Sequence, residues 1–291
     1  MTIRHKLRKI LDAIASIRKA KFSTSAEKIE KITRLLSEGK FSRALHLAED
    51  DIATLYASGS MLGKQGNRQI AEKVFQRISQ LTPTDTEQWS MKGVALRNLG
   101  RYREAVYCYD RIISRDSTNA SAWSNKGVAL GRLGKNEEAI ECYDRALEFE
   151  PDHAGAWSNK GVLLGRTGEY QKAVECYEKA ISIDPNHAEV WSNKGTALEK
   201  LGRHMEAMQC YDRAVKLNQH QAEAWNNMGV TLASVGKYRE AATCYDRALE
   251  LDPRNIDAWY KKGLALEKLG RRREAESCFS KAVKVEIDAK Q

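Results

Sequence analysis

The chain has 291 residues, with 48 Lys and Arg residues against 39 Asp and Glu residues and a formal net charge of +9. No stretch approaches the roughly 18 uninterrupted apolar residues that a membrane-spanning helix needs. Asp12 interrupts the apolar run near the N-terminus, which argues against an ordinary secretory signal. We therefore expect a cytoplasmic protein without membrane spans.

Residues 1–24 are the first predicted element, a basic amphipathic helix. They contain seven Lys or Arg residues and one Asp, so most of the net charge of the chain lies here. The apolar side chains share one helical face. They are Ile3, Leu7, Ile10, Leu11, Ile14 and Ile17. We expect this helix to cap the hairpin that follows; docking to another protein, or to nucleic acid or an anionic membrane surface, are the alternatives.

Residues 25–51 and 52–85 come next, as a shortened and a divergent copy of a 34-residue helical hairpin. Residues 25–51 have Gly39 and Ala44 at the matching positions but lack seven residues of the period. Residues 52–85 have Leu in place of the Trp that marks the later copies. Their residues in phase are Leu55, Gly59, Leu62, Gly66, Ala71, Phe75, Ile78 and Pro83.

Six regular copies follow between Thr86 and Ala289. All six tryptophans of the chain stand 34 residues apart, and all six cysteines keep the same period. The series are Trp89, Trp123, Trp157, Trp191, Trp225 and Trp259, and Cys108, Cys142, Cys176, Cys210, Cys244 and Cys278. The predicted units are 86–119, 120–153, 154–187, 188–221, 222–255 and 256–289.

Each regular unit contains two runs of apolar or small residues at helical spacing. A glycine able to adopt the left-handed conformation ends the first run, and proline closes the second where it occurs. In residues 120–153 these positions are Trp123, Gly127, Leu130 and Gly134, then Ala139, Tyr143, Ala146 and Pro151. Helices of about 13 residues are not stable alone, so the hairpins must bury their apolar faces by stacking on one another.

This pattern resembles the tetratricopeptide repeat. The resemblance implies an all-α, right-handed superhelical solenoid of antiparallel helix-turn-helix repeats. It also implies that first helices line a concave groove that binds other proteins. One departure is systematic, because the position three after Trp is lysine in five of the six regular copies and Met228 in the other. A lysine stem can lie on apolar neighbours, so the fold prediction is unaffected.

The sequence does not support an enzyme, a metal site or a cofactor. The six histidines include no pair at metal-binding helical spacing, and no CxxC occurs. The cysteines, about one repeat apart, are interpreted as partly buried packing residues. The glycines of the NKG triplets are interpreted as allowing close helix packing rather than phosphate binding. Carboxylates such as Asp110 and Asp246 are interpreted as a solvated outer face.

The resemblance implies that groove-facing positions lie at fixed offsets from each Trp. In this chain they are small and polar over an apolar floor, which favours an extended peptide. The expected peptide-binding residues are Asn125, Asn159, Asn193, Asn227, Ser124, Ser158, Ser192, Val128, Val162, Arg132, Arg166 and Lys200.

The four asparagines among them stand two residues after Trp in successive repeats. A carboxamide both donates and accepts, so such a series can pair with the backbone of a bound peptide. It is similar to the asparagine ladder in the tetratricopeptide superhelix of O-GlcNAc transferases. The alternative is that these asparagines bond only to a neighbouring helix. A dicarboxylate clamp for chaperone C-termini is not supported, because Ser and Val occupy positions where it needs Lys and Asn.

Groove charge suggests the chemistry of the ligand. Arg132 and Arg166 stand near Gly131, Gly155 and Gly165 with no acidic residue expected beside them, so an acidic or phosphorylated segment is expected to bind there. Residues 86–289 contain 31 basic and 30 acidic residues, which weakens the case for a nucleic-acid groove.

The expected function is protein–protein interaction through an extended segment of a partner. Binding of nucleic acid or an anionic surface by residues 1–24 is the alternative. The sequence ends two residues past the sixth regular unit, so Phe279, Ala282 and Val283 are expected to form an uncovered face. That face leads us to expect homo-oligomers through the C-terminal end.

Overall fold

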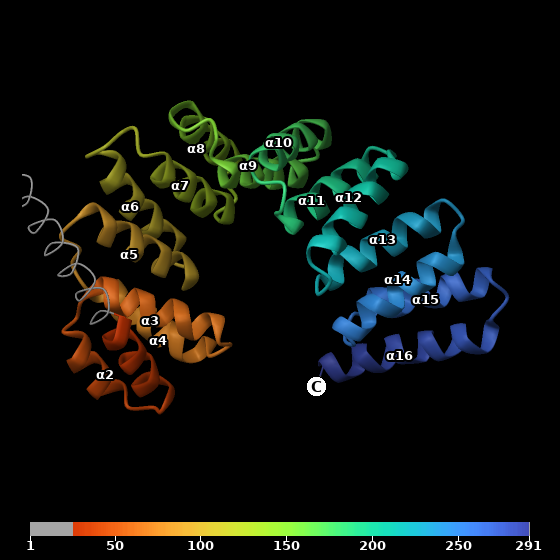
Figure 1. The fold of residues 1–291 in the computed structure, drawn as a ribbon, viewed down its shortest axis with the longest axis horizontal. Helices are drawn as coiled ribbons and strands as arrows, with labels where there is room; N and C mark the ends of the chain where they lie inside the picture. The colour runs from red at the N-terminus through yellow and green to blue at the C-terminus, as the bar shows by residue number, and fades with distance from the viewer. Residues whose placement is uncertain (1–25, 291) are drawn as a thin grey trace, which may run out of the picture. The chain divides into compact units, whose positions relative to one another are not determined.

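The computed structural model describes residues 26–290, and this part of the chain contains helices and no strand (Figure 1). A helix covers residues 26–37. The others are α2 (Phe41–Ala48), α3 (Ile52–Lys64), α4 (Arg68–Gln80), α5 (Thr86–Asn98), α6 (Tyr102–Ile113), α7 (Ala120–Arg132), α8 (Asn136–Phe149), α9 (Ala154–Arg166), α10 (Tyr170–Ile183), α11 (Ala188–Lys200), α12 (His204–Leu217), α13 (Ala222–Ser234), α14 (Tyr238–Leu251), α15 (Ile256–Lys268) and α16 (Arg272–Lys290). The amphipathic helix expected for residues 1–24 lies outside the described residues.

From α5 onward the first helices recur at the period of the sequence. They begin at Thr86, Ala120, Ala154, Ala188, Ala222 and Ile256, each 34 residues after the one before. Each contacts the helix that follows it, as α7 contacts α8 and α9 contacts α10. The prediction of an all-α array of antiparallel helical hairpins is confirmed (Figure 1).

The chain divides into two compact units, Met1–Phe149 (unit 1) and Glu150–Gln291 (unit 2). In unit 1 the first helices α3, α5 and α7 contact one another in order, and in unit 2 the same holds for α9, α11, α13 and α15. Each unit therefore has a face formed by first helices.

A glycine in the left-handed conformation ends the first helix of every hairpin. Gly134, for example, has a φ of 78°, and the N–H of Lys135 donates to the carbonyl of Leu130 at 3.0 Å. This bond satisfies a carbonyl that has no partner within the helix. The sequence predicted these glycines correctly, because only glycine adopts this conformation without strain.

A second glycine series lets the two helices of a hairpin approach closely. A Cβ on Gly161 in α9 would lie 2.7 Å from Cε1 of Tyr177 in α10, a distance that real Cβ atoms do not reach. The same relation joins Gly195 to Tyr211 at 2.7 Å. The tyrosine ring therefore fills the space beside the glycine, as the sequence interpretation of the NKG glycines expected.

Five of the six tryptophans tie their first helix to the turn before it. Nε1 of Trp157 donates to the carbonyl of Pro151 at 2.9 Å, and Nε1 of Trp191 donates to that of Pro185 at 2.9 Å. Trp89 differs, because its buried Nε1 has no partner within the described residues.

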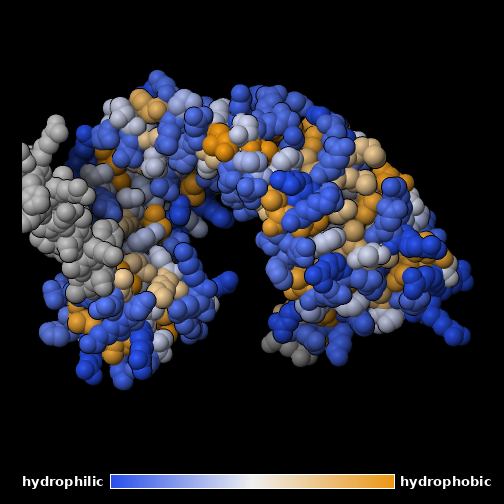
Figure 2. Space-filling model, viewed as in Figure 1, coloured by the Kyte–Doolittle hydropathy of each residue, from blue (hydrophilic) through white to orange (hydrophobic). Residues whose placement is uncertain are grey.

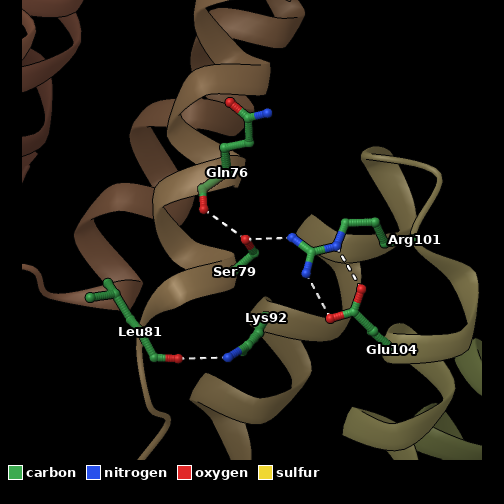
Figure 3. Close-up of polar contacts among 6 residues, drawn as sticks. All are labelled: Gln76, Ser79, Leu81, Lys92, Arg101 and Glu104. Carbon is green, nitrogen blue, oxygen red and sulfur yellow. Dashed lines mark hydrogen bonds and ion pairs between the residues drawn. The ribbon is translucent and has the colours of Figure 1, made fainter.

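Polar contacts join the repeat of α3 and α4 to the repeat of α5 and α6 (Figure 3). Nζ of Lys92 donates to the carbonyl of Leu81 at 2.7 Å, and Nη1 of Arg101 donates to Oγ of Ser79 at 2.7 Å. Glu104 holds the same guanidinium through two hydrogen bonds of 2.7 Å. The lysines three residues after Trp, which depart from the family pattern, thus contribute contacts between successive repeats.

Lysines at the same position of the repeat form ion pairs between later repeats. Nζ of Lys126 lies 2.7 Å from Asp110, and Nζ of Lys194 lies 2.9 Å from Glu178 on the preceding second helix. Lys262 pairs with Asp246 in the same way. Asp110 and Asp246 are exposed, as the interpretation of a solvated outer face expected. The two side chains also bridge successive repeats.

The six cysteines are free and buried, more fully than the sequence interpretation expected. Burial raises the pKa of Cys108, Cys142, Cys210 and Cys244 to about 11, because the thiolate would lose its hydration. These thiols therefore remain protonated at neutral pH, as packing residues of the second helices.

The surface that Figure 2 presents is mainly hydrophilic, with hydrophobic residues in separate patches. No helix among residues 26–290 combines the length and apolar character that a bilayer span requires. At the end of unit 2, Val283 is 55% exposed, whereas Ala282 is buried and the Phe279 ring packs beside Tyr260. The expected uncovered face is thus wrong for Ala282, and oligomerisation through this end stays a prediction.

Candidate functional site

Two adjoining pockets lie on the first-helix face of unit 2. The first, which we call the Arg166 pocket, has a volume of about 360 Å³. It is lined by Val162, Gly165, Arg166, Tyr170, Tyr177, Asn193, Thr196, Ala197, Lys200 and Glu223. These residues come from α9, α10, α11 and α13, so the stacking of three successive repeats forms the pocket.

The second, the Asn159 pocket, has a volume of about 290 Å³ and shares Val162 with the first. It lies toward the N-terminal ends of α9 and α11. Its lining is Ala154, Gly155, Ser158, Asn159, Val162, Ala180, Asp184, His187, Glu189 and Val190. The two pockets together bring six of the twelve expected site residues to one surface: Ser158, Asn159, Val162, Arg166, Asn193 and Lys200.

The four asparagines of the predicted ladder have different surroundings, although all are half-buried. Oδ1 of Asn125 accepts a bond from Arg97 at 3.1 Å, and Nδ2 of Asn227 donates to Thr196 at 3.5 Å. Asn159 and Asn193 make no side-chain hydrogen bond within residues 26–290 and line one pocket each. Two carboxamides are therefore available in unit 2, and the other two bond to a neighbouring first helix.

The serines one residue after Trp do not share one environment either. Ser124 is 6% exposed and Ser192 is 3% exposed, whereas Ser158 lines the Asn159 pocket. Ser124 and Ser192 therefore present little surface, and their contact with a ligand stays a prediction. At the same phase Asn226 is buried, and its Nδ2 lies 3.3 Å from Asp257 in the next repeat. The position one residue after Trp therefore also faces the first helix of the following repeat.

Three of the expected groove cations are exposed. Arg132, Arg166 and Lys200 form no ion pair among the described residues. Arg132 belongs to unit 1, as does half-buried Val128, so neither lines the unit 2 pockets. Arg166 and Lys200 line one pocket, and Glu223 lines it too. The expectation that no acidic residue stands near Arg166 is therefore wrong, although the pocket keeps one more positive than negative charge.

Two tyrosines of the Arg166 pocket were missed by the sequence analysis. Tyr177 is a second-helix residue whose ring packs against Gly161, and its hydroxyl lies toward Gly165. Burial is the main cause that raises the pKa of Tyr177, so its hydroxyl stays protonated and can donate a hydrogen bond. The signal in the sequence was the recurrence of tyrosine at this position of the repeat, together with Gly165, which stands one turn after the closely packed Gly161.

The neighbouring repeat satisfies the same hydroxyl internally. Oη of Tyr211 lies 3.2 Å from Oγ1 of Thr196 and 3.2 Å from Oε2 of Glu199. Glu199 replaces the glycine found at Gly165. A side chain at this position of the repeat therefore hydrogen-bonds to the tyrosine hydroxyl. In α9 the residue at this position is Gly165, which leaves the hydroxyl of Tyr177 open to a ligand.

The linings of the two pockets offer groups that can bind a ligand. Within residues 26–290 no three His, Cys, Asp or Glu residues come together as a metal site. The pockets combine two free carboxamides, an apolar wall at Val162 and two cations. Three carboxylates line them as well, Glu223 in the Arg166 pocket and Asp184 and Glu189 in the Asn159 pocket. Such a surface can hold a peptide backbone and an anionic side chain.

Comparison with known families gives one match over most of the chain. The family described as the C-terminal domain of cilia and flagella-associated protein 70 matches residues 41–291. No curated protein matches the chain in sequence at a significant level.

Several solved structures are similar. The crystal structure of MamA is 28% identical with a TM-score of 0.54 and covers 57% of this chain and 97% of that chain. The structure of YrrB, described as a tetratricopeptide-repeat protein with an unusual peptide-binding site, is 28% identical with a TM-score of 0.55 and covers 62% of this chain and 93% of that chain. PilF of Pseudomonas aeruginosa has a TM-score of 0.62 at 19% identity, covers 66% of this chain and 88% of its own, and shows similarity of fold alone.

Proposed function

From a chain that belongs to the family of the cilia and flagella-associated protein 70 C-terminal domain, built of tetratricopeptide repeats, we propose a non-enzymatic scaffold that binds an extended segment of a partner protein. The binding surface in unit 2 is formed by the Arg166 and Asn159 pockets. The observation that carries the proposal is the pair of free carboxamides at Asn159 and Asn193, one in each pocket.

The carboxamides explain how a segment of varied sequence could be held. Asn159 and Asn193 occupy the same position on neighbouring first helices, α9 and α11. Each offers a donor and an acceptor, which are the groups that one peptide unit requires. A backbone lying across both helices would bond to each asparagine whatever side chains it carries, and the pockets would select among those side chains.

The charges favour an anionic side chain in the Arg166 pocket. Arg166 and Lys200 are exposed and form no ion pair among the described residues, so both can bond to a carboxylate. The absence of a Cβ at Gly165 leaves room between Arg166 and Tyr177. We therefore assign to the partner an extended segment with an acidic residue.

The relatives support the same class of function. YrrB, which is 28% identical over the matched part, is described as having a peptide-binding site. Peptide binding is a property of that protein, and for this chain it is part of the proposal.

The asparagines can be tested with a fluorescein-labelled nine-residue peptide of Glu, Ser and Leu. Replacing Asn159 and Asn193 together with alanine should weaken its binding to unit 2 about ten- to a hundredfold, because each net hydrogen bond contributes about 0.5–1.5 kcal/mol. Fluorescence anisotropy would measure the affinity. The matched control replaces Asn186 and Gln209, two exposed carboxamides outside the pockets, with alanine. Equal affinities of the two double variants, with equal helical content by circular dichroism, would contradict the backbone role.

The cations are tested by reversing charge. Arg166→Glu with Lys200→Glu should weaken binding of the acidic peptide to unit 2 at least tenfold, since two attractive pairs become repulsive. A peptide with Lys in place of Glu should gain affinity for the same variant. Lys179→Glu with Arg213→Glu changes the net charge equally on the exposed faces of α10 and α12 and should have little effect.

Two results would count against this assignment. One is a preference of the wild-type chain for the Lys peptide over the Glu peptide. The other is a loss of acidic-peptide binding on deletion of residues 1–24, because that result would place the interaction on the basic N-terminal segment.

A further inference from the structure

A third pocket, in unit 1, is not explained by the proposed function. It has a volume of about 500 Å³ and lies among α3, α4 and the end of α5. Its principal lining residues are Gly63, Lys64, Arg68, Glu72, Phe75 and Asn98. We call it the Lys64 pocket.

This pocket corresponds to the Arg166 pocket in its position within the repeat. Gly63, Lys64 and Phe75 stand three 34-residue repeats before Gly165, Arg166 and Tyr177. In the same register Asn98 corresponds to Lys200 and Arg68 to Tyr170. Each unit thus has a glycine followed by a cation at the end of a first helix, above an aromatic ring of the second helix.

Gly63 is not required by the packing of the hairpin. A Cβ on Gly59, one turn earlier in α3, would lie 2.9 Å from Cε1 of Phe75, so packing explains that glycine. A Cβ on Gly63 would meet nothing within 4 Å. Alanine inside a helix is favoured over glycine, so Gly63 leaves α3 less stable while keeping the pocket open.

The charges of the pocket are available to a ligand. Lys64 and Arg68 are exposed and form no ion pair among residues 26–290, and Glu72 is the acidic residue of the lining. Asn98 makes no side-chain hydrogen bond within the same residues and offers a free carboxamide. The ring beneath is Phe75, which lacks the hydroxyl that Tyr177 presents in unit 2, so the floor is apolar.

We infer that the Lys64 pocket is a second peptide-binding site, which takes an extended acidic segment whose apolar side chain fills the space over Phe75 beside Gly63. Lys64 and Arg68 bind a carboxylate of that segment, and Asn98 bonds to its backbone. The inference goes beyond the proposed function, because it concerns unit 1 and holds whether or not the unit 2 pockets bind.

Two sites on one chain have a consequence for affinity. A partner with two acidic segments joined by a linker that spans both sites would bind the second site at a raised effective concentration once the first is occupied. A partner with one segment would bind twice per chain. Stoichiometry therefore separates the two pockets without knowledge of the natural partner.

The test uses the full chain and the Glu, Ser and Leu peptide in isothermal titration calorimetry. Wild type should bind two peptides per chain, Lys64→Glu with Arg68→Glu should bind one, and the variant with all four reversals should bind none. Arg43→Glu with Lys73→Glu, at exposed cations of unit 1 outside the pocket, should still bind two. Circular dichroism checks that each variant is folded.

A second variant tests the apolar space. In the chain with Arg166→Glu and Lys200→Glu, which isolates unit 1, Gly63→Leu should reduce peptide binding at least tenfold. The open surroundings of Gly63 should allow that variant to fold. In the same background a peptide with Ser in place of Leu should bind more weakly than the original.

The outcomes separate this inference from the proposed function. One peptide per wild-type chain, lost on reversal of Arg166 and Lys200 and unaffected by reversal of Lys64 and Arg68, would overturn the second site and leave the first. One peptide lost only on reversal of Lys64 and Arg68 would support the second site and count against the first. Binding of the peptide in unit 1 unchanged by Gly63→Leu would also overturn the inference.

Discussion

Replacing Tyr211 with alanine should lower the free energy of unfolding by about 3–5 kcal/mol, as for other large aromatic residues in a core. The side chain is fully buried, and its ring fills the space beside Gly195. The cavity would open between the two helices of one hairpin, beside Gly195. Urea unfolding followed by far-ultraviolet circular dichroism measures the change.

Tyr211→Phe is the matched control. It keeps the ring and removes only the hydroxyl that lies 3.2 Å from Thr196 and 3.2 Å from Glu199. We expect a loss of about 1 kcal/mol, the net contribution of a hydrogen bond. A loss from Tyr211→Phe as large as that from Tyr211→Ala would mean that the hydrogen bonds, and not ring packing, hold this hairpin together.

Two glycines of α9 should respond to alanine with opposite signs. Gly161→Ala should destabilise the chain, because the new Cβ would lie 2.7 Å from the buried Tyr177 ring. Gly165→Ala should stabilise it by up to about 1 kcal/mol, because the nearest atom to its Cβ is the Tyr177 hydroxyl at 3.9 Å and alanine favours the helix. The difference in the free energy of unfolding between the two variants isolates the cost of overpacking at Gly161, about 1–3 kcal/mol.

Thermal and urea unfolding of the two variants and wild type make the comparison. Gly165→Ala also places a methyl group at the wall of the Arg166 pocket, so its affinity for the acidic peptide should fall while its stability rises. Equal stabilities of the two alanine variants would contradict the assignment of Gly161 to helix packing and of Gly165 to the pocket.

Part of the candidate site was predictable and part was not. In the sequence, Asn159 and Asn193 share one position of the repeat, and Arg166 and Lys200 share another. The structure brings all four to two adjoining pockets. The sequence could not distinguish Asn159 and Asn193 from Asn125 and Asn227, which stand at the same position of the repeat. The distinction depends on side chains of other repeats, because Arg97 reaches Asn125 and Thr196 reaches Asn227.

The lysines three residues after Trp illustrate the same limit. From the sequence, Lys126 was a polar residue whose stem could lie on apolar neighbours. In the structure it forms an ion pair of 2.7 Å with Asp110, on the second helix of the preceding repeat. Such a pair depends on how one hairpin stacks on the next, and no local spacing in the sequence encodes that distance.

The sequence by itself determined the hairpins of this protein. A glycine that must adopt a positive φ, a Trp that bonds to the preceding turn and a Gly–Tyr contact within one repeat act over short separations, and recurrence every 34 residues repeats the result. The tertiary structure decided which groove residues remain free to bind. A hydrogen-bonding group is available only when no neighbouring repeat satisfies it, and its neighbours are set by stacking across a whole repeat.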